Sequence, residues 1–278
     1  MDTGNVTPES VAAAATESAS GLSSHQSPTT NHRTGWRHSR WLAFVEFALV
    51  ALIFYADHRG WIPISKTPEL LLLGWISLRV RGLRWRDVGL TRYRAGEDPT
   101  LAAKNAARLG QPPQDHRPFS WPRTIAIGFA LGALLETFQL TVTQPILSRL
   151  LGRQPDLELF RMLTGNLKMT ALFIALSWTL AAFGEEMVWR GYLMSRVADV
   201  FGRGRPAWAA SLLIVSAVFG LAHGYQGLTG WIEEAIAGLA LGAMYLGMGR
   251  NLWVPIFAHG VSDTIDMVLL FLGKMPGM

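Results

Sequence analysis

The sequence predicts an all-α fold, a polytopic transmembrane bundle of about seven helices around a buried polar site. Half of the 278 residues are hydrophobic, 16% are charged, and eleven are tryptophans. This composition is typical of helical membrane proteins rather than of water-soluble enzymes of the same length. The basic residues cluster between the apolar runs, as the positive-inside rule requires of a membrane protein.

The first part of the chain is expected to hold a tail, a membrane hairpin and a basic loop. Residues 1–35 are rich in Ser, Thr, Ala, Asn and Gly and lack a periodic apolar face, which predicts disorder. Residues 36–121 begin with the apolar runs of the hairpin, near 41–56 and 68–80. The stretch from Arg79 to Arg123, both included, contains ten Lys or Arg and four acidic residues. This charge favours a cytoplasmic loop and places the N-terminus on the same side.

Residues 122–278 are predicted to form the helical core. Apolar runs joined by short connections lie roughly at 122–147, 168–195, 207–224, 230–248 and 252–273. The number of spans stays open by about one, because a short apolar run can be re-entrant. The spacing Gly238-x-x-x-Gly242 predicts that two of these helices pack closely.

Composition also limits the chemistry. The chain has no cysteine, so any metal must be held by His, Asp, Glu or water. A net charge of +5 is the only feature that suggests nucleic acid, and we expect no nucleic-acid partner. The HExxH and GxSxG motifs and phosphate-binding glycine loops are absent. Zincin, serine-hydrolase and nucleotide-driven functions therefore have no support.

Two adjacent glutamates, Glu185 and Glu186, lie inside an apolar predicted helix. Ionisable residues in such a place are functional candidates by default. Neighbouring residues of a helix point about 100° apart, so the two carboxylates face different surroundings. The i,i+4 spacing predicts an ion pair between Glu186 and Arg190, which leaves Glu185 free as a general base for water. The alternative is that both glutamates pair with Arg190 and Arg196 at a helix end.

Two further predicted helices each carry a histidine, His223 and His259, and Asp263 follows His259 by one turn. Alone, each histidine is more typical of a core or interfacial residue. Together with Glu185 they form a candidate hydrolytic centre, in which Asp263 orients His259 or binds with it. Counted at about 1.5 Å per residue from flanking arginines, Glu185 and His259 reach similar depths and His223 a greater one. Helix tilt or a later helix start would explain the difference.

The other intramembrane acids are assigned no chemistry. Glu46 and Glu136 stand alone, without a motif around them. Glu233 and Glu234 repeat the glutamate pair, but position 238 is a glycine, so the matching arginine is missing.

The motifs together resemble the CPBP intramembrane proteases, the CAAX-protease and bacteriocin-processing family that is also called Abi. The family pattern is EExxxR, FxxxH, and then HxxxN or HxxxD on successive membrane helices. The matching residues, in order, are Glu185, Glu186, Arg190, Phe219, His223, His259 and Asp263. The segment from Trp85 to Leu90 also resembles an upstream family segment, and the resemblance covers about residues 85–273.

The resemblance implies a CAAX-protease-type intramembrane endopeptidase with a polar cavity open to the cytoplasm. Glu185 would activate the attacking water with help from His223, and His259 and Asp263 would stabilise the oxyanion. The supporting residues of the site would be Glu186, Arg190 and Phe219. The substrate would be a peptide or lipid-anchored protein cut near the membrane surface. The lipid bilayer would be a bacterial plasma membrane, with the N-terminus in the cytoplasm.

Three questions stay open at this stage. Eukaryotic members carry Asn where this chain has Asp263, and an ionised Asp cannot donate to an oxyanion. Asp263 is therefore protonated, binds a metal, or orients His259. Zinc could be held by Glu185, His223, His259 and Asp263, although we favour a water activated by Glu and His. A non-proteolytic scaffold or immunity-type binding protein would keep the same residues, and a proton-coupled transporter would show inverted repeats, which are not evident.

Overall fold

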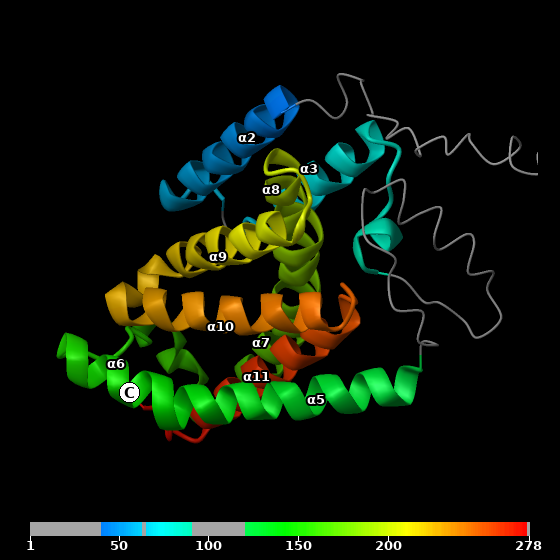
Figure 1. Cartoon of the computed structure of the whole chain (residues 1–278). Coiled ribbons are helices and arrows are strands. Elements are labelled where there is room, and N and C mark those ends of the chain that lie inside the picture. The colour runs from blue at the N-terminus through cyan, green and yellow to red at the C-terminus, as the bar shows by residue number, and fades with distance from the viewer. Residues whose placement is uncertain (1–39, 63–64, 91–119, 277–278) are drawn as a thin grey trace, which may run out of the picture. The chain divides into compact units, whose positions relative to one another are not determined.

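The computed structural model describes residues 40–62, 65–90 and 120–276, and within them the regular secondary structure is helical. The predictions of a disordered tail at 1–35 and of a cytoplasmic loop fall largely outside these residues. The first part described contains α2 (Arg40–His58), α3 (Thr67–Val80) and the 3-10 helix η2 (Trp85–Val88) (Figure 1).

Five long helical segments make up the rest of the described chain, and two of them contain π-helical stretches. The first runs through α5 (Trp121–Phe138), the π-helix η3 (Gln139–Thr143) and α6 (Gln144–Leu151). The second runs through α7 (Leu167–Leu176), the π-helices η5 (Ser177–Glu185) and η6 (Met187–Leu193), and α8 (Met194–Val200). The others are α9 (Arg205–Ala222), α10 (Gly227–Gly247) and α11 (Trp253–Phe271). Short 3-10 helices are η4 (Glu158–Leu163) and η7 (Gly224–Gln226).

The helix boundaries follow the apolar runs and local start signals. Pro68, Pro122 and Pro206 lie in the first turn of α3, α5 and α9, where a missing N–H costs nothing. Asn166 caps α7 by accepting a hydrogen bond of 3.2 Å from the backbone N–H of Met169.

Five segments among the described residues are long and apolar enough to cross a membrane. They are Trp41–His58, Trp121–Leu151, Leu167–Val200, Arg205–Ala222 and Trp253–Phe271. The predicted runs at 68–80 and 230–248 are also helices, but α3 has only 14 residues, fewer than the roughly 20 of a full span. Large side chains such as Leu134 and Leu150 are 64% and 76% exposed on the spans, a surface suited to lipid. The protein is an integral, multi-pass membrane protein.

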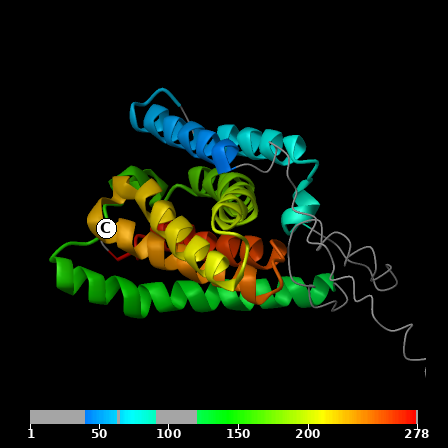
Figure 2. The same ribbon diagram turned by 45° about the horizontal axis from the view of Figure 1, so that its top comes forward.

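Glycines bring the core helices into close contact. Gly128 and Gly132 of α5 lie against Phe257 and Ala258 of α11, and the two helices run side by side (Figure 2). A Cβ on Gly238 of α10 would lie 3.0 Å from the ring of Phe219 on α9. The predicted close packing at the Gly238 spacing is therefore confirmed, and it fixes the helix that precedes His223.

A buried ion pair joins the first two helices. Arg81 donates to both carboxylate oxygens of Glu46, at 2.5 and 3.2 Å, and also to the hydroxyl of Ser77 at 2.8 Å. The interpretation of Glu46 as an isolated acid is therefore wrong. Its partner lies 35 residues away, at the start of the basic stretch, and only the folded hairpin brings the two together.

Candidate active site

The glutamate pair lies in an unusual stretch of helix. Residues Ser177–Glu185 and Met187–Leu193 form π-helices, separated only by Glu186. π-helical turns are rare and frequently occur at functional sites. The side chain of Glu186 is fully buried, whereas Glu185 is partly exposed and lines a cavity. The two carboxylates therefore do face different surroundings, as predicted.

Glu186 is the centre of a buried network. Its Oε1 accepts two hydrogen bonds, one of 2.6 Å from Arg190 Nη1 and one of 2.9 Å from His259 Nδ1. Arg190 also donates a hydrogen bond of 3.0 Å to the carbonyl oxygen of Gly238. Its guanidinium lies 4.7 Å from the ring centroid of Phe219. The predicted ion pair is confirmed, and the network explains how Arg190 tolerates almost complete burial.

The same network fixes the orientation of His259. Because a carboxylate only accepts hydrogen bonds, the bond to Glu186 places a proton on Nδ1. Nε2 then points towards Asp263, whose Oδ1 lies 3.5 Å away. The other oxygen of Asp263 accepts a hydrogen bond from the hydroxyl of Ser177. Ser177 was missed by the sequence analysis, because a single serine in an apolar helix carries no motif.

His223 ends α9 rather than lying inside it. Its Nδ1 is 2.9 Å from the carbonyl oxygen of Phe219 and donates to it, which leaves Nε2 as an acceptor. The Phe219 ring lies between the two histidines, with ring centroids 4.8 Å from His223 and 6.3 Å from His259. Since α9 begins at Arg205, a late helix start does not explain the depth of His223.

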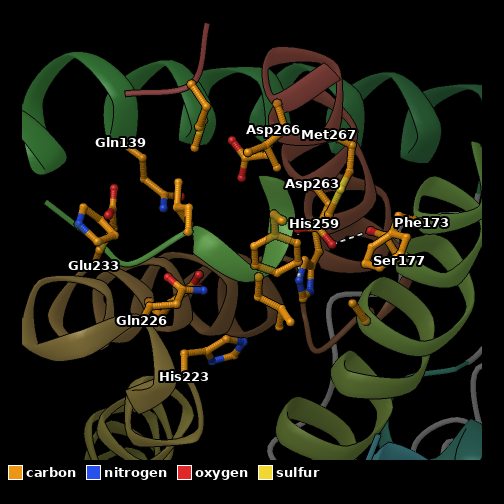
Figure 3. A pocket seen from close by; sticks show the side chains of 18 of the residues that line it. Gln139, Phe173, Ser177, His223, Gln226, Glu233, His259, Asp263, Asp266 and Met267 are labelled. Atoms are coloured by element: carbon orange, nitrogen blue, oxygen red, sulfur yellow. Dashed lines mark hydrogen bonds and ion pairs between the residues drawn. The ribbon is translucent and has the colours of Figure 1, made fainter. Parts of the chain in front are cut away.

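All four predicted catalytic residues, Glu185, His223, His259 and Asp263, line one cavity of about 430 Å³. Figure 3 shows this cavity and labels the two histidines and Asp263. Glu185 Oε2 is buried and has no hydrogen-bond partner among the described residues. Arg196 instead contacts Asp199 at 2.7 Å. The alternative in which both glutamates pair with Arg190 and Arg196 is therefore wrong.

The cavity also gathers acids that the sequence analysis set aside. Glu136 of α5, Glu233 and Glu234 of α10, and Asp266 of α11 all line it. Glu136 accepts a 2.5 Å hydrogen bond from the hydroxyl of Ser262, and its carboxyl group lies close to that of Asp266. The interpretation of Glu136 as an isolated acid is therefore wrong. The signal that could have found these acids is their presence in apolar helices, which we discounted because no short motif links them.

Among the residues that the structure describes, no group of three or more His, Asp or Glu side chains is placed to hold a metal ion. We therefore derive no chemical step through a metal.

Comparison with known proteins places the site in a family. Residues 167–265 match the family model described as type II CAAX prenyl endopeptidase Rce1-like. The resemblance to the CAAX proteases that the motifs predict is therefore confirmed over this region. The matched region runs from α7 into α11 and contains all four predicted catalytic residues, which supports an intramembrane protease of the CAAX type at the family level. No curated protein and no solved structure matches the chain.

Proposed function

We propose that this protein is a CAAX-type protease that hydrolyses a peptide bond near the membrane surface with a water molecule activated by Glu185 and His223. The observation that carries the proposal is the free, buried Oε2 of Glu185 in a cavity that it shares with His223. A carboxylate without another partner is available to accept a proton from water, and the acceptor Nε2 of His223 can hold that water in place.

In the proposed reaction, Glu185 takes a proton from water while the oxygen attacks the scissile carbonyl carbon. The imidazolium form of His259, which is flanked by Glu186 and Asp263, has an Nε2–H that donates to the oxyanion of the tetrahedral intermediate. Collapse of the intermediate breaks the C–N bond. Glu185 then returns its proton to the leaving amine, so that one water and one peptide give one acid and one amine.

Asp263 is assigned a positioning role. An ionised Asp cannot donate to an oxyanion, and this one accepts from Ser177 while it faces His259. Of the three roles left open by the sequence, orientation of His259 has the support of these contacts. Asp263→Asn should keep the shape of the site and change the pH profile of kcat more than KM.

Part of the cavity wall is apolar, which suits a membrane-anchored or lipid-modified segment. The apolar lining residues include Leu157, Phe160, Phe173 and Met267. A flexible segment entering from lipid or from the cytoplasmic face would place its backbone at Glu185 and its apolar groups on this wall. The substrate class proposed is therefore a membrane-associated peptide or lipid-anchored protein.

The decisive experiment compares wild-type protein with Glu185→Gln in liposomes. The probe is a peptide with a prenylated cysteine followed by three residues, and an amphipathic peptide serves as a second probe. Glu185→Gln keeps shape but removes the base, so cleavage measured by mass spectrometry should fall at least about 100-fold. Glu69→Gln removes an exposed carboxylate from α3 outside the cavity and should cleave normally.

Full cleavage by Glu185→Gln would refute the mechanism. Loss of cleavage on chelation, restored by zinc, would refute its metal-independent form. A cellular phenotype that survives Glu185→Gln but not deletion of the gene would favour the scaffold alternative.

A further inference from the structure

Four acids of the cavity have no part in the proposed reaction. Glu136, Glu233, Glu234 and Asp266 come from three helices and line the same cavity as Glu185. In Figure 3, Glu233 and Gln139 lie on the side of the cavity away from Ser177. We call Glu136, Gln144, Glu233, Glu234 and Asp266 the acidic subsite.

The charge of the cavity is unbalanced. Its described lining residues include six acids and two histidines, and neither a lysine nor an arginine. Two cations that interact with the glutamates of the site are already engaged, because Arg190 pairs with Glu186 and Lys66 lies 3.0 Å from Asp57. Carboxylates in a poorly solvated site are costly unless protons or a cation offset their charge. Glu136 accepts a hydrogen bond from Ser262, whereas the lining of the cavity offers no lysine or arginine to the two acids of α10, Glu233 and Glu234.

An independent observation points to a missing donor. Gln144 is only 2% exposed and lines the cavity, yet its Oε1 has no hydrogen-bond partner among the described residues. Asp266 Oδ1 is also buried and has no hydrogen-bond partner among the described residues. Buried acceptors are normally satisfied, so both oxygens are available to a ligand that brings N–H groups.

The ligand chemistry follows from the type of the acceptors, which are carboxylate and amide oxygens on three helical segments. They do not form a group able to hold a metal ion, as the described residues show. An ammonium with three donors, or a guanidinium with five, reaches separate acceptors from one charged centre.

We propose that the acidic subsite binds a lysine or arginine side chain of the peptide whose scissile bond lies at Glu185. The proposal rests on the proposed function for the position of that bond. It makes the enzyme selective for peptides with a cationic residue near the cleavage point, and it gives the four remaining acids a shared task.

The test measures binding to the Glu185→Gln protein in neutral detergent, so that the result does not depend on turnover. The probes are short fluorescein-labelled peptides with blocked ends that carry Lys, Arg, Glu or norleucine at successive positions. Norleucine keeps the lysine chain without its ammonium. At one position, the Lys or Arg peptide should bind at least about tenfold tighter than the norleucine peptide, as a desolvated charge-assisted contact predicts.

Variants assign the preference to the subsite. Adding Glu233→Gln or Gln144→Leu to Glu185→Gln should reduce the ratio of norleucine to lysine dissociation constants several-fold. Adding Glu69→Gln, which removes an exposed carboxylate, should leave it unchanged. Size-exclusion profiles check that each variant is folded. If a variant does not fold, the comparison of lysine and norleucine peptides on the Glu185→Gln protein still tests the proposal.

The outcomes separate this proposal from the proposed function. Equal affinity for Lys, Arg and norleucine peptides at every position would overturn the subsite, even if wild-type protein cleaves them. A clear Lys preference with no cleavage by wild-type protein would support the subsite and refute the protease proposal. A preference that survives both subsite variants would place the cation elsewhere and overturn the assignment.

Discussion

Replacing Glu186 by Ala is expected to destabilise the helix bundle rather than only slow the reaction. The single oxygen Oε1 accepts from both Arg190 and His259, so one substitution removes both bonds. Arg190 would keep only the Gly238 carbonyl and the Phe219 ring, with its side chain 2% exposed. Removing one partner of a buried ion pair costs about 3–5 kcal/mol. Because both hydrogen bonds end on one oxygen, we expect this range for the whole loss of unfolding free energy, rather than the sum of two separate losses.

The assay is reversible unfolding in detergent, followed by tryptophan fluorescence. Glu186→Gln keeps an acceptor at Oε1 and should lose less, about 1–3 kcal/mol. The double variant Glu186→Ala with Arg190→Met removes the stranded cation and should recover at least half of the loss. A change below about 0.5 kcal/mol for Glu186→Ala, or a double variant no better than the single one, would refute the reasoning.

Three further predictions use matched pairs of variants. Arg81→Ala strands the buried Glu46 and should cost about 3–5 kcal/mol of unfolding free energy, whereas Arg79→Ala at the exposed neighbour should cost little; equal effects would contradict this. Gly132→Ala would place a Cβ 2.9 Å from the Ala258 Cα and should destabilise by about 1–3 kcal/mol, whereas Gly247→Ala has open space; a stable Gly132→Ala would show that α5 and α11 can separate freely. Cysteine in place of Arg94 should resist an impermeant thiol reagent in intact cells, and its labelling from outside would reverse the proposed cytoplasmic position of the loop.

Helix positions and the motif residues could be predicted from sequence because both depend on short-range patterns. The runs predicted at 168–195 and 252–273 correspond to Leu167–Val200 and Trp253–Phe271. The Glu186–Arg190 pair follows directly from one helical turn. A continuous apolar stretch in lipid has few alternatives to a helix, since its backbone groups must bond internally.

Contacts between distant segments could not be predicted in the same way. The partner of Glu46 lies 35 residues away, and Ser177 and Asp263 are 86 residues apart. Glu136 and Asp266 meet only because α5 and α11 pack along glycines. The π-helices also escaped prediction, because the choice between α and π hydrogen bonding depends on tertiary contacts rather than on residue type alone.

The π-helices alter how the glutamate-bearing segment fits the thickness of a bilayer. Leu167–Val200 has 34 residues, which would measure about 50 Å as an α-helix, against a hydrocarbon core of about 30 Å. A π-helix places more residues in each turn and therefore rises less per residue, and stretches of nine and seven residues here adopt it. The segment is thus shorter and wider than its residue count suggests. The additional residues are accommodated as a greater helix width near Glu185, and small residues let the neighbours approach this wide stretch, since Gly260 of α11 lies against Trp178.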